Sequence, residues 1–97
     1  MRPLHPYLVL LSLFTGGRID ADDFEAIFLP LYKYDPTLWS EADFGILDRL
    51  FGYVDGYCPD PVLRAKVGGL DGGSLLAHCG ECLQELKANL AVLDFGS

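Results

Sequence analysis

Apolar positions recur at helical spacing along most of this 97-residue chain, and no strand-like alternation competes with them. The pattern falls into four stretches, at residues 7–14, 24–32, 44–54 and 75–93. Short polar connections separate the stretches and favour antiparallel neighbours. The sequence therefore predicts an all-α fold, an antiparallel four-helix bundle.

Residues that cap or end helices mark the borders of these stretches. Asp20, Ser40 and Asp71 stand where the second, third and last helices are expected to begin. Asp60 followed by Pro61 is typical of a fresh helix start, which predicts an extra short helical turn between the third and last long helices. The last helix is expected to end near residues 91–93.

Prolines and aromatic residues predict further details of the packing. Pro30 is expected to kink or shorten the end of the second helix, near Tyr32. Trp39, Phe44 and Phe51 are assigned to the core or to a lid over it, because they lie on the apolar face of the third helix or just before it.

Composition indicates one folded domain over residues 1–97 with a strongly acidic surface. Hydrophobic residues make up 51% of the chain, which excludes disorder, and the net charge is -7. Between residues 20 and 60 there are ten acidic side chains and only two basic ones. Such a surface repels phosphates, so we expect a basic protein partner and no direct binding to nucleic acid. A charged face that only keeps the protein soluble is the alternative.

Three acids fall on one line of the third helix. Glu41, Asp48 and Asp55 recur at a spacing of seven, so they drift by only about 20° per step around the helix. Asp60 follows five residues after Asp55, beyond the stop at Gly56. We interpret these four carboxylates as a candidate binding surface.

Two tyrosines flank these carboxylates. Tyr53 falls away from the apolar face of its helix, and Tyr57 lies past the helix stop. Aromatic side chains beside charges often anchor protein interfaces. Both tyrosines join the candidate surface on this ground, with a half-buried structural role as the alternative.

The usual motifs of catalysis and cofactor binding are missing from the sequence. There is no glycine-rich phosphate loop, no nucleophile elbow and no His-Glu-x-x-His pair. Cys79 and Cys82 have the spacing of a thiol motif but fall on an apolar helical stripe, so we expect buried packing residues. Structural zinc would need Cys58 and a histidine as further ligands. We therefore predict a protein that is not an enzyme and has no catalytic residue, cofactor or metal.

Cysteine use and hydropathy also indicate where the protein acts. Three cysteines are an odd number and argue for a reducing compartment, so cytoplasm is expected. The apolar run from Tyr7 to Phe14 is far too short to span a bilayer, so no membrane partner is expected.

Several segments together resemble the colicin D immunity family of bacterial self-protection proteins. They are Phe14-Thr-Gly-Gly-Arg-Ile-Asp-Ala-Asp-Asp-Phe24, Ile46-Leu-Asp-Arg-Leu-Phe51, Asp55 and Pro59-Asp60, and the resemblance covers residues 13–86. It implies a four-helix bundle that plugs the active site of a cognate tRNA-cleaving toxin domain by mimicking tRNA phosphates. The toxin is a bacteriocin or a contact-dependent toxin, and a monomeric immunity protein in a 1:1 complex is expected.

By motif position, the resemblance places Asp55 and Asp60 in the toxin's catalytic groove. Asp48 and Glu41 are added from the helical line alone. A cytoplasmic acidic adaptor or regulatory protein that docks a basic partner unrelated to toxins is the alternative function.

Overall fold

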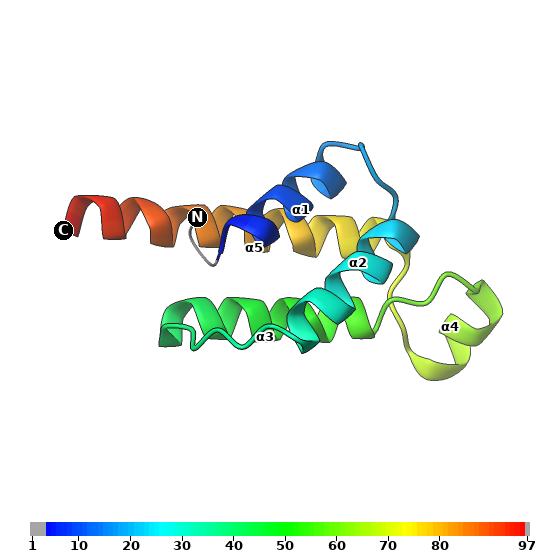
Figure 1. Cartoon of the computed structure of the whole chain (residues 1–97). Coiled ribbons are helices and arrows are strands. Elements are labelled where there is room, and N and C mark those ends of the chain that lie inside the picture. Colours follow the sequence, from blue (N-terminus) through cyan, green and yellow to red (C-terminus); the bar gives the residue numbers. More distant parts are fainter. Residues whose placement is uncertain (1–3, 97) are drawn as a thin grey trace.

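The structure, a computed structural model, describes residues 4–96, with side chains described for residues 4–90 (Figure 1). It contains five helices: α1 (His5–Thr15), α2 (Ala21–Lys33), α3 (Glu41–Asp55), α4 (Pro61–Val67) and α5 (Gly72–Gly96). Apart from one isolated bridge between Tyr57 and Leu70, residues 4–96 contain no β-structure. The prediction of an all-α fold is confirmed, and α4 is the expected extra turn.

The predicted cap residues all accept a backbone N–H within the first turn of their helices. The N···O distances are 2.8 Å for Asp20, 3.2 Å for Ser40, 2.9 Å for Asp60 and 2.7 Å for Asp71. Each such cap stabilises a helix by about 1 kcal/mol. These residues therefore fix where α2, α3, α4 and α5 begin.

The four long helices share one core. Helix α5 packs against α1, α2 and α3, and α2 also packs against α1 and α3. Consecutive long helices run in opposite directions (Figure 1). Stacked aromatic rings run along α2, with centroids 4.7 Å apart for Phe14 and Phe24 and 5.6 Å apart for Phe24 and Phe28.

Cys79 and Cys82 are fully buried in this core. Burial, together with the neighbouring Cys82, raises the pKa of the Cys79 thiol to about 12. Such a thiol stays protonated at neutral pH and is a poor nucleophile. The prediction that the two cysteines are packing residues is confirmed.

Three expectations about element ends and packing need correction or refinement. Phe44 was assigned to the core but is 50% exposed. The Trp39 ring closes that end of the core instead, packing edge-on against Tyr7 with centroids 5.6 Å apart. Helix α5 continues to Gly96, beyond its expected end. Pro30 lies within α2, which extends to Lys33.

Helix α4 stands apart from the core. Among the described residues, it packs against none of the other helices and has no buried side chain. Two backbone hydrogen bonds close its base: the N–H of Cys58 donates to Leu70 O at 2.9 Å, and the N–H of Leu70 donates to Gly56 O at 2.8 Å. The base is therefore fixed while α4 itself projects from the molecule (Figure 1).

Among the described helices, none combines the length and the hydropathy that a membrane crossing requires.

Candidate functional site

The acidic line predicted on α3 is exposed in the structure. Glu41, Asp48 and Asp55 all face solvent. At about 1.5 Å of rise per residue, the line runs for about 21 Å along the helix. Asp60 is also exposed, but its Oδ1 atom is held as the α4 cap by the N–H groups of Val62 and Leu63. The prediction that Asp60 begins and caps α4 is therefore confirmed. The cap uses only Oδ1, so the other carboxylate oxygen can still bind a partner.

Asp55, at the end of α3, lies near further acidic residues at the start of α2. Because α2 and α3 run in opposite directions and pack together, the first turn of α2 lies beside the last turn of α3. Tyr57 joins them: its Oη donates to Asp22 Oδ1 at 2.7 Å. We call Asp20, Asp22, Glu25 and Asp55 the α2–α3 acidic cluster.

Burial and nearby negative charge together raise two pKa values at this junction. Burial, the hydrogen bond to Asp22 and the nearby charges of Glu25 and Asp20 raise the pKa of Tyr57 to about 12. Burial and the charges of Asp22 and Asp55 also raise the pKa of Glu25 above its ordinary value. The cluster therefore contains carboxylates that repel one another at neutral pH.

The position of Asp55 adds to this strain. It is the last residue of α3, where the helix macrodipole is negative, and the last turn of α3 contains no basic residue. Negative charge at this helix end is unfavourable for the isolated protein. The fold alone therefore gives no reason for an acid at this position.

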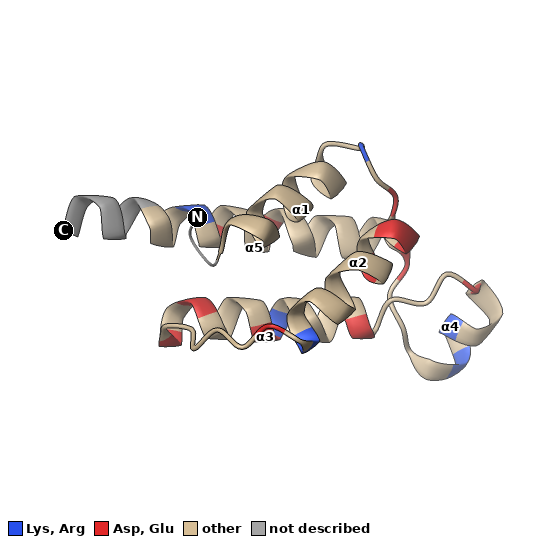
Figure 2. Ribbon diagram, in the orientation of Figure 1, with Lys and Arg blue, Asp and Glu red and all other residues tan. Residues whose placement is uncertain are grey.

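Among side chains 4–90, no basic group forms an ion pair with the cluster. The only ion pair within this range joins Arg49 of α3 to Glu85 of α5. Arg64 donates to the backbone oxygen of Cys58 at 3.0 Å, and the Lys33 ammonium lies over the Tyr34 ring. Figure 2 shows acidic positions gathered where α2 begins and α3 ends. The cluster thus offers uncompensated charge to a cationic partner.

The two tyrosines of the candidate surface are both half-buried. The Tyr53 ring stacks on His78 of α5, with centroids 4.0 Å apart and planes 8° apart. Tyr57 is held by its bond to Asp22. Tyr57 is therefore placed to orient the acidic cluster, whereas Tyr53 serves the α3–α5 contact.

Two glycines continue the exposed acidic line of α3. Gly45 and Gly52 alternate with Glu41, Asp48 and Asp55 along one exposed stripe. A Cβ atom added at either glycine would meet nothing within 4 Å. Glycine inside a helix is about 1 kcal/mol less favourable than alanine. Packing within the described residues therefore does not explain why these two positions are glycine.

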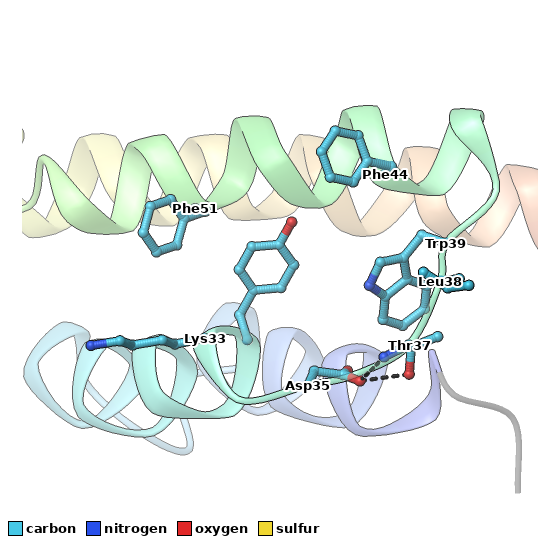
Figure 3. Close-up of a pocket in the computed structure, with 8 residues that line it drawn as sticks. Lys33, Asp35, Thr37, Leu38, Trp39, Phe44 and Phe51 are labelled. Carbon is cyan, nitrogen blue, oxygen red and sulfur yellow. Dashed lines mark hydrogen bonds between the residues drawn. The ribbon is translucent and has the colours of Figure 1, made fainter.

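A separate open groove of about 490 Å³ lies between the end of α2, the following linker and α3. Its apolar walls include Leu38, Trp39 and Phe44 (Figure 3). The Asp35 carboxylate accepts hydrogen bonds from the hydroxyl and the N–H of Thr37, at 2.5 and 2.9 Å, and fixes the linker. Of the described residues that line the groove, only Lys33 and Asp35 carry charge.

In the part of the chain that the structure describes, no three His, Cys, Asp or Glu side chains gather as metal ligands would. The acidic cluster also lacks a nucleophile or a histidine to act with its carboxylates. Its geometry suits the binding of positive charge.

The surface predicted from the sequence contained only one member of the cluster, Asp55, and missed that Asp20, Asp22 and Glu25 lie with it. The antiparallel packing of α2 on α3 is what brings them to Asp55. The high acid density at residues 20–25, combined with the predicted up-and-down topology, was the available signal.

Comparison with known proteins gave one family match. The model of a family described as bacterial self-protective colicin-like immunity matches residues 3–86. Neither the comparison with curated proteins nor the one with solved structures gave a match. A match over most of the chain establishes the family, so the chain belongs to the bacterial self-protective colicin-like immunity family.

Proposed function

We propose that this protein neutralises a cognate tRNA-cleaving toxin by placing carboxylates in the toxin's basic RNA-binding groove. Membership of the immunity family implies a toxin protein as the partner. The nuclease target and the mimicry of tRNA phosphates are our proposal. The observation that carries it is the α2–α3 acidic cluster, which is dense, exposed at Asp22 and Asp55, and free of basic partners among side chains 4–90.

The physical reasoning starts from the toxin. A nuclease domain needs lysine and arginine side chains where it holds the RNA backbone. Carboxylates fixed on a rigid scaffold compete for those side chains, form charge-assisted hydrogen bonds and speed the encounter by steering. Tyr57 supports this role, because its hydrogen bond holds Asp22 in place before the partner arrives, and the charges of Asp22 and Asp55 both act on Glu25.

Asp60 and the exposed stripe of α3 extend the proposed surface. The Asp60 cap occupies only Oδ1, so the same carboxylate can accept a lysine or arginine through its other oxygen. Gly45 and Gly52 leave room for the partner's backbone to approach between Glu41, Asp48 and Asp55. We propose a 1:1 complex in the cytoplasm, with the protein acting as an inhibitor and not as an enzyme.

The test uses the C-terminal nuclease domain of the toxin encoded beside this chain's gene. We expect the wild-type protein to bind this domain and to stop its cleavage of tRNA at a 1:1 ratio. The Asp22→Asn/Asp55→Asn variant keeps a hydrogen-bond acceptor for Tyr57 but loses two charges. We expect its Kd to rise by about tenfold or more, or ~1.4 kcal/mol.

Glu81→Gln is the matched control, because Glu81 is an exposed acid on α5, away from the α2–α3 junction. The control should bind like the wild type. If the double variant also binds like the wild type, the acidic cluster is not the binding surface. If the protein binds a basic partner but no nuclease, the adaptor function is correct instead.

A further inference from the structure

Helix α4 exposes an unusual amount of apolar surface for so short a segment. Val62, Leu63 and Val67 are 64%, 49% and 64% exposed. They belong to a seven-residue helix without a buried side chain. We call these three residues the α4 apolar face. Exposed apolar side chains gathered on one projecting element are typical of a protein interaction site.

The element that presents this face is rigidly anchored. Gly69 packs so closely that an added Cβ would lie 2.9 Å from Gly56 O and 3.1 Å from the Cys58 Cβ. Gly68 ends α4 in the left-handed conformation, with φ of 69°. The Arg64 guanidinium bonds back to the Cys58 carbonyl oxygen at 3.0 Å. Together with the two backbone bonds at the base, these contacts hold α4 in one orientation.

The α4 apolar face is continuous with the proposed acidic surface. Asp60, one of the proposed toxin-binding acids, accepts the N–H groups of Val62 and Leu63. A partner group that reaches Asp60 therefore lies at the first turn of the helix that bears both side chains. Tyr57 lies at the base of the segment that carries α4, where it pairs with Leu70, and its hydroxyl donates to Asp22 of the α2–α3 acidic cluster.

We infer that the α4 apolar face docks on an apolar patch of the same toxin domain, beside its basic groove. This inference rests on the proposed function. The charge distribution supports a patch outside the groove, because α4 itself carries Arg64 and Lys66, which a basic groove repels. Acids then supply steering and register, and the apolar face supplies contact that salt does not screen. Selectivity among related basic nucleases follows from this second contact.

The experiment measures the Kd of four forms of the protein for the nuclease domain of the toxin encoded beside this gene, in 50 mM and 500 mM NaCl. The forms are the wild type, the Asp22→Asn/Asp55→Asn variant, a test variant and its control. The test variant is Val62→Thr/Leu63→Gln/Val67→Thr. The matched control is Val9→Thr/Leu13→Gln/Ile27→Thr, which removes similar apolar surface from residues 43%, 38% and 48% exposed on α1 and α2. Far-UV circular dichroism and Tm verify that each variant folds.

We expect the α4 variant to raise the Kd by about tenfold or more, by the same factor at both salt concentrations, with the control unchanged. The Asp22→Asn/Asp55→Asn variant differs, because its effect shrinks at high salt. If the α4 variant and the wild type bind equally while the acidic variant binds weakly, the inference is wrong and the proposed function stands. If the α4 variant and its control lose the same amount of affinity for the nuclease domain, the inference is also wrong. If the wild type does not bind the nuclease, the proposed function fails first.

Discussion

Asp55 is placed where it weakens the isolated fold, so replacing it by asparagine should stabilise the protein. The residue ends α3 at the negative pole of the helix dipole, and it raises the pKa of Glu25 across the α2–α3 contact. The Asp55→Asn substitution keeps the size and polarity of the side chain and removes only its charge. Stability and toxin binding are therefore expected to change in opposite directions in this variant.

The magnitude follows from the two contributions. Relief of the unfavourable dipole interaction at an exposed helix end gives about 0.3–1 kcal/mol. Loss of like-charge repulsion with Glu25 adds a few tenths of a kcal/mol for partly exposed groups. In a domain of this size, each kcal/mol shifts Tm by about 4–8 °C. We expect a rise of several degrees, and a smaller rise in high salt because both contributions are screened.

The assay is thermal and urea unfolding at neutral pH in low and high salt, with Glu81→Gln as the control for removal of an exposed acid. A lower Tm for Asp55→Asn than for the wild type would refute the reasoning. That result would mean that the Asp55 carboxylate makes a stabilising contact. An equal rise for Glu81→Gln would show that net charge, and not the position of Asp55, sets the effect.

Three further predictions concern the exposed stripe of α3 and the α2–α3 acidic cluster. Glu25→Gln should stabilise the protein at neutral pH, because the folded-state pKa of Glu25 lies above its unfolded value. Unfolding measured at a series of pH values should show that this gain in stability disappears as pH falls through the folded-state pKa and then the unfolded-state pKa. A gain that stays constant with pH would contradict the prediction. Gly45→Ala and Gly52→Ala should each raise the free energy of unfolding by about 1 kcal/mol in urea titrations. Gly52→Gln should weaken toxin binding. Unchanged stability in the alanine variants would mean that these sites do not behave as ordinary helix interior. Tyr57→Phe should lower the free energy of unfolding by about 1 kcal/mol in the same titrations, because the hydrogen bond to Asp22 is lost. The wild type loses stability between pH 10 and about 12 because the folded-state pKa of Tyr57 is raised, and the variant should not show this part of the loss. An unchanged loss of stability at alkaline pH would count against the bond to Asp22.

Local signals in the sequence were sufficient for most of the fold. Asp20, Ser40, Asp60 and Asp71 each cap the helix that they were expected to begin, because an N-cap depends on its own next three residues. Helical periodicity likewise predicted the burial of the Cys79 and Cys82 side chains. These features depend on short-range geometry, which a single sequence contains.

Features that depend on contacts between distant segments were predicted less well. Phe44 has the spacing of a core residue, yet Trp39 from the linker closes the core at that end. Only Asp55 of the acidic cluster was predicted as part of the binding surface, because the charges of Asp22 and Asp55 meet at Glu25 only through the packing of α2 on α3. The exposure of α4 could not be predicted from the sequence, because the apolar residues of a short helix do not show whether another helix packs over them.

The central claim is that fixed carboxylates at the α2–α3 junction take the place of RNA phosphates in a cationic groove. The most direct test is competition between this protein and tRNA for the catalytically inactive nuclease domain of the toxin encoded beside its gene. We predict mutually exclusive binding, with tRNA displaced by the wild type and far less by Asp22→Asn/Asp55→Asn. A stable ternary complex of nuclease, tRNA and this protein would contradict the account.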